Sequence, residues 1–300
     1  MSTSMSRMKN ISIFELMRFV VKILDFLVAS NIYVSLGAYT LTRLSLEFYQ
    51  IENSELAYFV FFSTLFAYNF MRLARVHPML LEGESVRHQS IYKLRSFLWF
   101  FCIVSGLMAF YFFMAIYKAV LFPLIFLAIV SMAYGLPIYK KTTGWMRLRD
   151  VPGLKIFLIA ISWALVTEGL PVLINGQKLE FLPLLERFLF VFAITIPFDI
   201  RDLRFDEPNL ATIPQYFGVR KARLIGISAL LMAELILAYR FFFEGDFNLW
   251  GAIAIYLTYE LSVFMVYKSH PKLKERFVTV GVEGMSILMG VLFFFSQRIV

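Results

Sequence analysis

Three aspartates close the sixth long hydrophobic segment of the chain: Asp199, Asp202 and Asp206. In a helical backbone their spacing of i, i+3 and i+7 places them on one face. Carboxylates crowded together at a membrane boundary repel one another, so they imply a divalent cation, and Mg²⁺ held by carboxylates commonly bridges to phosphate oxygens. The run predicts a Mg²⁺ site with these three ligands. The alternative is a solvated loop balanced by Arg201 and Arg204.

The composition excludes a soluble globular protein. The 300 residues are 60% hydrophobic and 17% charged, whereas soluble chains are roughly 45–50% apolar and about 25% charged. A membrane core about 30 Å thick requires about 20 apolar residues per helix. We therefore expect one all-α membrane domain over residues 1–300, with residues 1–15 as a cytoplasmic lead. It would have nine spans, at about 20–44, 56–76, 96–116, 119–138, 154–174, 182–198, 222–243, 247–267 and 277–297.

The basic residues indicate the orientation of the chain in the membrane. With the N-terminus inside, 23 of the 29 Lys and Arg residues fall in the inner segments. This asymmetry places the N-terminus in the cytoplasm and the C-terminus outside, and a bacterial inner membrane is the expected location. The net charge of +8 therefore indicates topology, and we expect the lipid bilayer rather than nucleic acid as a partner. The single cysteine, Cys102, excludes an internal disulfide.

The aspartate run continues into a longer pattern. Residues 199–206 are followed by Ala211-Thr212-Ile213-Pro214 and Phe217-Gly218-Val219. This pattern resembles the second aspartate-rich motif of the UbiA-type membrane prenyltransferases, except that Pro208-Asn209-Leu210 replaces the usual glycine. The resemblance implies a nine-helix bundle around a central cavity open to the cytoplasm. It also implies catalytic and metal-binding roles for Asp199, Asp202 and Asp206.

A second similarity follows the fourth predicted span. Tyr134 precedes the basic pair Lys140-Lys141, which resembles the Tyr…Lys-Arg element of the same family, although the second basic residue is Lys and Tyr134 stands further away than usual. The resemblance implies that Tyr134, Lys140 and Lys141 bind the substrate diphosphate. The alternative is ordinary anchoring at the inner membrane face by lysines and an interfacial tyrosine.

The first aspartate motif of that family, N-D-x-x-D-x-x-x-D, is degenerate here. It corresponds to residues 69–77, where Asn69 is kept but the aspartate positions hold other residues: Phe70, Leu73 and His77. The loss should remove one of the family's two metal sites. Guanidinium groups match phosphate oxygens, so we expect Arg72 and Arg201 among the diphosphate-binding residues, and the resemblance adds the retained Asn69. The alternative for Arg72 and Arg75 is that both are inner-face anchors.

The resemblance implies Mg²⁺-dependent transfer of a prenyl group from a prenyl diphosphate to a small acceptor, for which an aromatic compound is one candidate. The first alternative is a diverged, inactive family member that binds an isoprenoid or lipid phosphate without transferring it. The second alternative is a membrane transporter. The sequence does not determine the oligomeric state, and it assigns no role to four acids inside predicted spans: Glu168, Glu234, Glu260 and Glu283.

Overall fold

The structure is a computed structural model in which residues 13–79, 95–136, 139–141, 144–148, 151, 153–204, 212–245 and 247–299 are described. The helices are α1 (Ile13–Ala29), α2 (Ile32–Phe48), α3 (Ser54–Met79), α5 (Arg95–Gly135), α6 (Leu154–Ala164), α7 (Leu170–Ile174), α8 (Phe181–Asp202), α9 (Ile213–Tyr239), α10 (Leu249–Lys268) and α11 (Gly284–Ser296). Three π-helical segments join them: η2 (Leu165–Gly169), η4 (Arg240–Glu244) and η5 (Phe277–Val282). A short antiparallel ribbon, β1 (Tyr139–Lys141) with β2 (Gly144–Met146), is the one non-helical element of the described residues. The predicted all-α class is confirmed.

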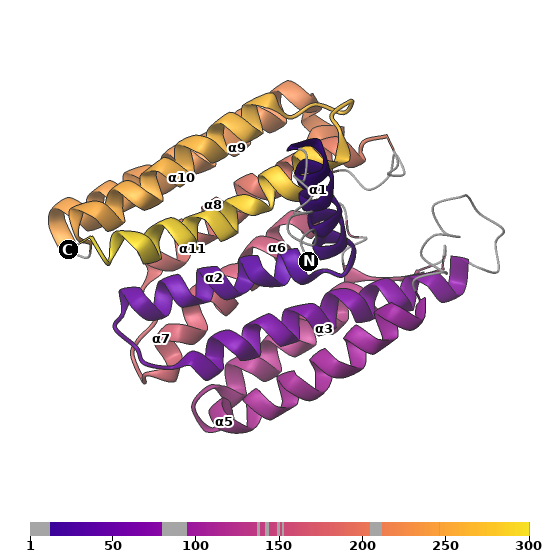
Figure 1. Cartoon of the computed structure of the whole chain (residues 1–300), viewed down its shortest axis with the longest axis horizontal. Helices are drawn as coiled ribbons and strands as arrows, with labels where there is room; N and C mark the ends of the chain where they lie inside the picture. The colour runs from indigo at the N-terminus through magenta and orange to yellow at the C-terminus, as the bar shows by residue number, and fades with distance from the viewer. Residues whose placement is uncertain are drawn as a thin grey trace, which may run out of the picture.

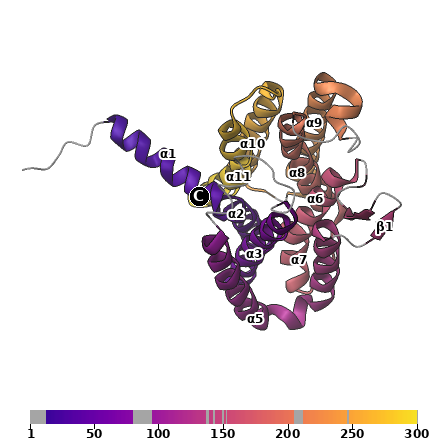
Figure 2. The same cartoon turned by 90° about the vertical axis from the view of Figure 1, so that its right-hand side faces the viewer.

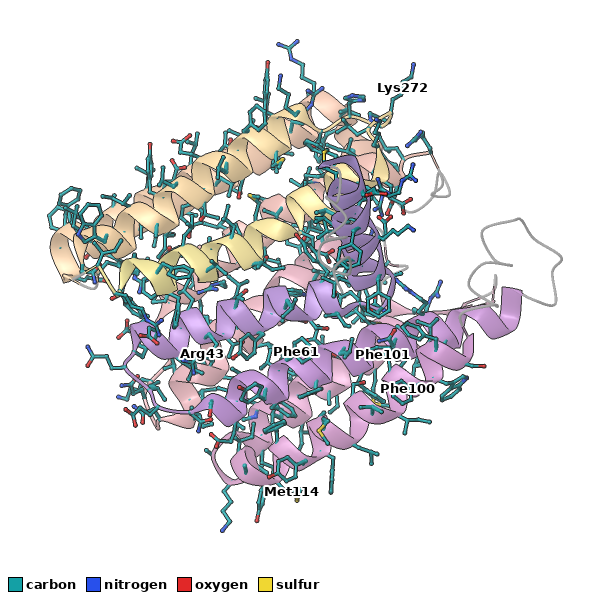
Figure 3. All side chains as sticks on the ribbon, viewed as in Figure 1. Arg43, Phe61, Phe100, Phe101, Met114 and Lys272 are labelled. Atoms are coloured by element: carbon teal, nitrogen blue, oxygen red, sulfur yellow. The ribbon has the colours of Figure 1, made fainter. Side chains whose placement is uncertain are left out.

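The long helices form an antiparallel bundle (Figure 1). Helices α9 and α10 lie along one edge and α3 and α5 along the other, while α2, α8 and α11 lie between them. We call the two ends of the bundle the Asp202 end, where α8 stops, and the Arg240 end, where α9 passes into η4. Figure 3 shows Lys272 at the Asp202 end, Arg43 towards the Arg240 end, and Phe100 and Met114 projecting outward from α5.

Helix α5 turns back on itself. A Cβ built on Gly106 would lie 3.2 Å from Phe66, and one built on Gly135 would lie 3.0 Å from Met71. In a straight helix positions 106 and 135 would be about 44 Å apart, whereas positions 66 and 71 are separated by about 8 Å. The chain must therefore reverse between the two glycines, in a segment that contains the helix-bending residue Pro123. Figure 2 shows the two arms of α5.

This reversal gives the expected number of membrane crossings. Seven described helices are long and apolar enough to cross a bilayer, and the bent pair α1 and α2 adds an eighth crossing. The apolar part of α5, residues 96–135, has 40 residues and is about 60 Å long, twice the thickness of the hydrocarbon core. Counting its two arms separately gives nine crossings, as the sequence predicts, and the chain is an integral membrane protein.

The boundaries predicted for the first span, 20–44, are wrong. Helix α1 ends at Ala29 and α2 begins at Ile32, and the two axes differ by 79°. Asn31 adopts a left-handed conformation with φ of 62°, which a helix cannot continue through and which asparagine tolerates better than most residues. The hydropathy of the two helices is continuous, so it does not reveal the bend. Figure 2 shows α1 extending away from the bundle.

Two buried ion pairs hold the helices together at the Arg240 end. Arg187 Nη2 lies 2.9 Å from Glu168 Oε2, and Arg240 Nη1 lies 2.6 Å from Glu186 Oε2. All four side chains are at most 7% exposed. Glu168 lies on η2 and Arg240 begins η4, so both π-helical segments carry a buried charge at this end, in keeping with the tendency of π-turns to occur at specialised sites.

Neighbouring hydroxyl and aromatic groups complete this network. Ser45 and Tyr49 donate hydrogen bonds to Glu168, and Tyr259 donates to Glu186 over 2.7 Å. Phe48 and Phe247 stack against the guanidinium of Arg240, with ring centroids 5.0 and 4.7 Å from Cζ. Buried charges are tolerated only when they are paired and hydrogen-bonded in this way. The network therefore links α2, η2, α8, η4 and α10.

Removing one member of this network should destabilise the whole bundle. We expect Arg240→Ala to lower the free energy of unfolding by about 3–5 kcal/mol, because it leaves Glu186 buried without its cation. The double variant Glu186→Gln/Arg240→Met should be more stable than the single variant. Thermal unfolding in detergent micelles measures both. Arg43→Ala is the matched control: Arg43 forms a partly exposed pair with Glu47 at 3.7 Å, for which less than about 1 kcal/mol is expected. Equal losses for Arg240→Ala and Arg43→Ala would contradict the expectation.

Candidate functional site

The two described aspartates of the predicted metal site lie in the last turns of α8, at the Asp202 end. The side chain of Asp199 is 2% exposed and that of Asp202 is 26% exposed. Helix α8 ends at Asp202, and Asp199 and Asp202 share one of its faces. Asp206 lies outside the described residues, and its role as a metal ligand stays a prediction.

Each described aspartate pairs with a cationic side chain. Lys155 Nζ lies 2.7 Å from Asp199 Oδ1, and Arg201 Nε lies 2.7 Å from Asp202 Oδ1. Lys155 stands in the first turn of α6, which begins directly after Gly153 in the left-handed conformation with φ of 71°. The positive charge of Lys155 also acts on Asp202. The cluster therefore contains two carboxylates and two cations from α6 and α8.

Lys155 is not predicted from the sequence as a site residue; there it is only one of the inner basic residues. Its contact with Asp199 depends on the packing of α6 against α8, which no local pattern reveals. The sequence offers one signal for it. Lys155 lies one residue past the start of the fifth predicted span, where an unpaired charge is costly, so a partner for it could be expected.

The described residues offer two carboxylates to a metal ion at this end, and the predicted Mg²⁺ site stays a prediction. Within the described residues no group of three or more metal-ligating side chains occurs. Asp199 and Asp202 each use Oδ1 in their ion pair, and carboxylate oxygens are the hard donors that Mg²⁺ prefers.

Glu283 lies near the arginines at this end of the bundle. It stands between η5 and α11, and its charge interacts with those of Arg201 on α8 and Arg72 on α3. Glu283 thus links the end of α8 to α3. The sequence analysis gave it no role, because nothing in its local pattern distinguishes it from other acids inside spans.

Asn69 and Arg72 contact the bend between α1 and α2. Asn69 is fully buried, and its amide donates to the carbonyls of Ser30, at 3.1 Å, and Leu65, at 2.9 Å. Its Oδ1 accepts from Asn31 Nδ2 at 2.8 Å, and Arg72 Nη2 donates to Asn31 Oδ1 at 2.9 Å. The structure therefore gives both residues a part in holding the bend, while their role in diphosphate binding stays a prediction.

The second predicted diphosphate element is only partly described. Tyr134 lies near the end of α5, and it interacts electrostatically with Lys155. Lys140 and Lys141 lie on β1, on a ribbon that stands apart from the long helices (Figure 2). The side chains of both lysines, and those of Arg75 and His77, lie outside the described residues. Of this element, only Tyr134 is therefore known to approach the cluster.

The segment after the aspartates begins α9. The backbone N–H of Thr212 donates to Gln215 Oε1 at 3.1 Å, and Pro214 stands in the first turn, where its missing N–H is not needed. Gly218 has φ of 79°, which only glycine adopts easily. The Thr-Ile-Pro and Phe-Gly matches to the family motif are thus a helix start and a kink.

The Asn69 contacts predict a structural effect. Asn69→Leu keeps the branching of the side chain but removes three hydrogen bonds, so the buried carbonyl of Ser30 and the side-chain amide of Asn31 lose their partner. We expect a loss of about 1–3 kcal/mol in stability and faster proteolysis at the bend. Thermal unfolding and limited proteolysis measure these effects. Ser63→Ala, which removes one local hydrogen bond within α3, is the control, and indistinguishable proteolysis of the two variants would contradict the assignment.

The comparisons with known proteins identify the fold. No protein-family model matches the sequence, and no curated protein sequence matches it. A structure of a UbiA homologue from Archaeoglobus fulgidus bound to Cd²⁺ superposes with a TM-score of 0.57 at 15% identity, covering 90% of this chain and 96% of the homologue. Structures of the A. fulgidus homologue bound to DMAPP and Mg²⁺ (14% identity, 91% and 97% coverage) and to GPP and Mg²⁺ (15% identity, 90% and 96% coverage) both give a TM-score of 0.54. The chain therefore has the UbiA-type membrane fold.

Proposed function

We propose that this protein is an integral-membrane prenyltransferase of the UbiA type, which transfers a prenyl group from a prenyl diphosphate to a small acceptor. The observation that carries the proposal is the cluster of Asp199, Asp202, Lys155 and Arg201 at one end of a fold whose neighbours bind DMAPP or GPP with Mg²⁺. The positive-inside bias supports a cytoplasmic Asp202 end, an outer C-terminus and a bacterial inner membrane.

The free carboxylate oxygens of Asp199 and Asp202, together with Asp206, would hold one Mg²⁺. When bound, the metal neutralises negative charge on the diphosphate leaving group. The donor set supports a single ion, since the first motif has Phe70 and Leu73 at two of its aspartate positions.

The cations of the cluster would supply the remaining charge. Lys155 and Arg201 carry N–H donors already aimed at oxyanions, and charge-assisted hydrogen bonds to phosphate oxygens are the strong ones. As the carbon–oxygen bond breaks, its electron pair goes to the diphosphate, and these donors stabilise that charge. The acceptor captures the allylic cation and loses a proton. The remaining diphosphate contacts are proposed from the resemblance: Asn69, Arg72, Tyr134, Lys140 and Lys141.

Glu283 would keep Arg72 and Arg201 at the Asp202 end. Its carboxylate interacts with both guanidinium groups, and a guanidinium held by a neighbouring acid is already oriented for a second oxyanion. We assign Glu283 a positioning role rather than contact with the substrate.

Binding of a prenyl diphosphate without transfer is the second candidate. It is favoured by one observation, the loss of the acids of the first motif at Phe70 and Leu73. The assay that follows separates it from catalysis.

Transfer should depend on Asp202. We expect purified protein in lipid nanodiscs, given radiolabelled geranylgeranyl diphosphate, Mg²⁺ and a membrane extract, to form a labelled lipid product. Asp202→Asn should reduce the rate at least about 100-fold, as loss of an electrostatic group in an active site typically does. Glu55→Gln, which alters an exposed acid of α3 near the other end, is the control. Absence of product from the unaltered protein, or equal rates for it and Asp202→Asn, would contradict transfer.

Diphosphate binding should depend on Lys155. We expect Lys155→Met to weaken binding of a non-reactive prenyl thiodiphosphate at least about tenfold, a loss of about 1.4 kcal/mol, because the ammonium is removed while the stem volume is kept. Isothermal calorimetry measures the affinity. Lys155→Met/Asp199→Asn removes both charges of the pair and tests whether any loss comes from an unpaired buried carboxylate. Affinity restored to the original value in the double variant would show that Lys155 only neutralises Asp199.

A further inference from the structure

Helices α9 and α10 carry acidic side chains that none of the chemistry above uses. Glu234 on α9 interacts electrostatically with Glu260 on α10, and Tyr256 Oη donates to Glu260 Oε1 at 2.8 Å. The Oε1 atom of Glu234 is shielded from solvent and has no hydrogen-bond partner in the described part of the chain. We call Glu234, Tyr256 and Glu260 the acidic seam.

The acidic seam lies on the outer surface of the bundle. The exposed side chains of α10 recur at helical spacing, as Ile253, Tyr256, Leu257, Glu260, Leu261 and Phe264. Leu231, Met232 and Leu235 form the matching exposed face of α9. Figure 1 shows the two helices together at one edge of the molecule. A surface this apolar on a membrane-crossing helix faces lipid.

The depth of the acidic seam is close to the middle of the membrane. Glu234 precedes the last residue of η4, Glu244, by ten positions, and Glu260 follows the first residue of α10, Leu249, by eleven. At 1.5 Å per residue both acids lie about 15 Å from the Arg240 end, half the thickness of a hydrocarbon core about 30 Å across.

Acids at this depth need a partner. A charged side chain at the centre of a lipid-exposed helix costs about 2.5–3.5 kcal/mol, and such acids normally face the bundle interior or pair with a cation. The chain pairs its interior acids, as Glu168 with Arg187 and Glu186 with Arg240. The electrostatic neighbour of Glu234 is instead a second acid, Glu260. The described residues of the chain supply no cation to this pair of acids, so a basic side chain from a partner would complete it.

We infer that the acidic seam is the docking site for a transmembrane helix of a partner protein that carries a lysine or arginine near its centre. The apolar side chains on either side, such as Leu235 and Leu257, would pack against that helix, and the cation would meet Glu234 and Glu260. A second copy of this chain, docked through the same face, would add two more carboxylates and no cation. Charge complementarity thus selects a basic partner helix over a homodimer.

The experiment uses the full chain in lipid vesicles. Protein labelled with a donor fluorophore is mixed with acceptor-labelled polyleucine helices that have lysines at both ends and either one central arginine or none. We expect the helix with arginine to associate at least tenfold more tightly than the helix without it. Glu234→Gln/Glu260→Gln should reduce this preference to less than twofold.

Two controls make the result decisive. Because no described cation pairs with the acidic seam, the double variant should keep the thermal stability of the unaltered protein, and Glu260→Gln alone provides a milder change. Glu55→Gln, an exposed acid away from α9 and α10, should keep the full preference. Equal binding of the two helices, an unchanged preference in the double variant, or a homodimer that the double variant loses would each overturn the inference. None of these readouts depends on the Asp202 end.

Discussion

A charge inside a membrane must be paired, and in this protein that requirement converges on α8. The helix contributes Glu186 and Arg187 to the network at the Arg240 end, and Asp199 and Asp202 to the cluster at the opposite end. These ion pairs fix the rotation of α8 about its own axis at two points, Glu186 and Asp199, which are about 20 Å apart along the helix. Because these partners come from α2, η2, α6, η4 and α10, the same pairs also fix the helices packed around α8.

The candidate site follows from this arrangement. The network at the start of α8 holds the helix so that Asp199 and Asp202 face Lys155 at its end. There the ammonium of Lys155 and the guanidinium of Arg201 balance the negative charges of the two aspartates. We propose that this cluster binds a diphosphate together with one metal ion. Glu283 connects it to α3 through Arg72.

Much of the fold could be predicted from the sequence, since hydropathy and charge bias are local properties. The nine crossings, including the two arms of α5, follow from runs of apolar residues. The bend at Asn31 could not be predicted, because hydropathy continues through it. Nor could the pairing of Lys155 with Asp199, or of Glu168 with Arg187, because each depends on helices that meet only in the folded bundle. Of the predicted site, Asp199, Asp202 and Arg201 lie together, while Asp206, Lys140 and Lys141 stay predictions.

The central claim is that the Asp202 end binds a prenyl diphosphate through both its carboxylates and its cations. The most direct measurement is a structure of the protein in lipid with a non-reactive prenyl thiodiphosphate and Mn²⁺, located by its anomalous scattering. We predict one metal ion on Asp202 and diphosphate oxygens within hydrogen-bond distance of Lys155 Nζ. An intact Lys155–Asp199 pair with no metal on Asp202, and the ligand bound elsewhere or not at all, would contradict the claim.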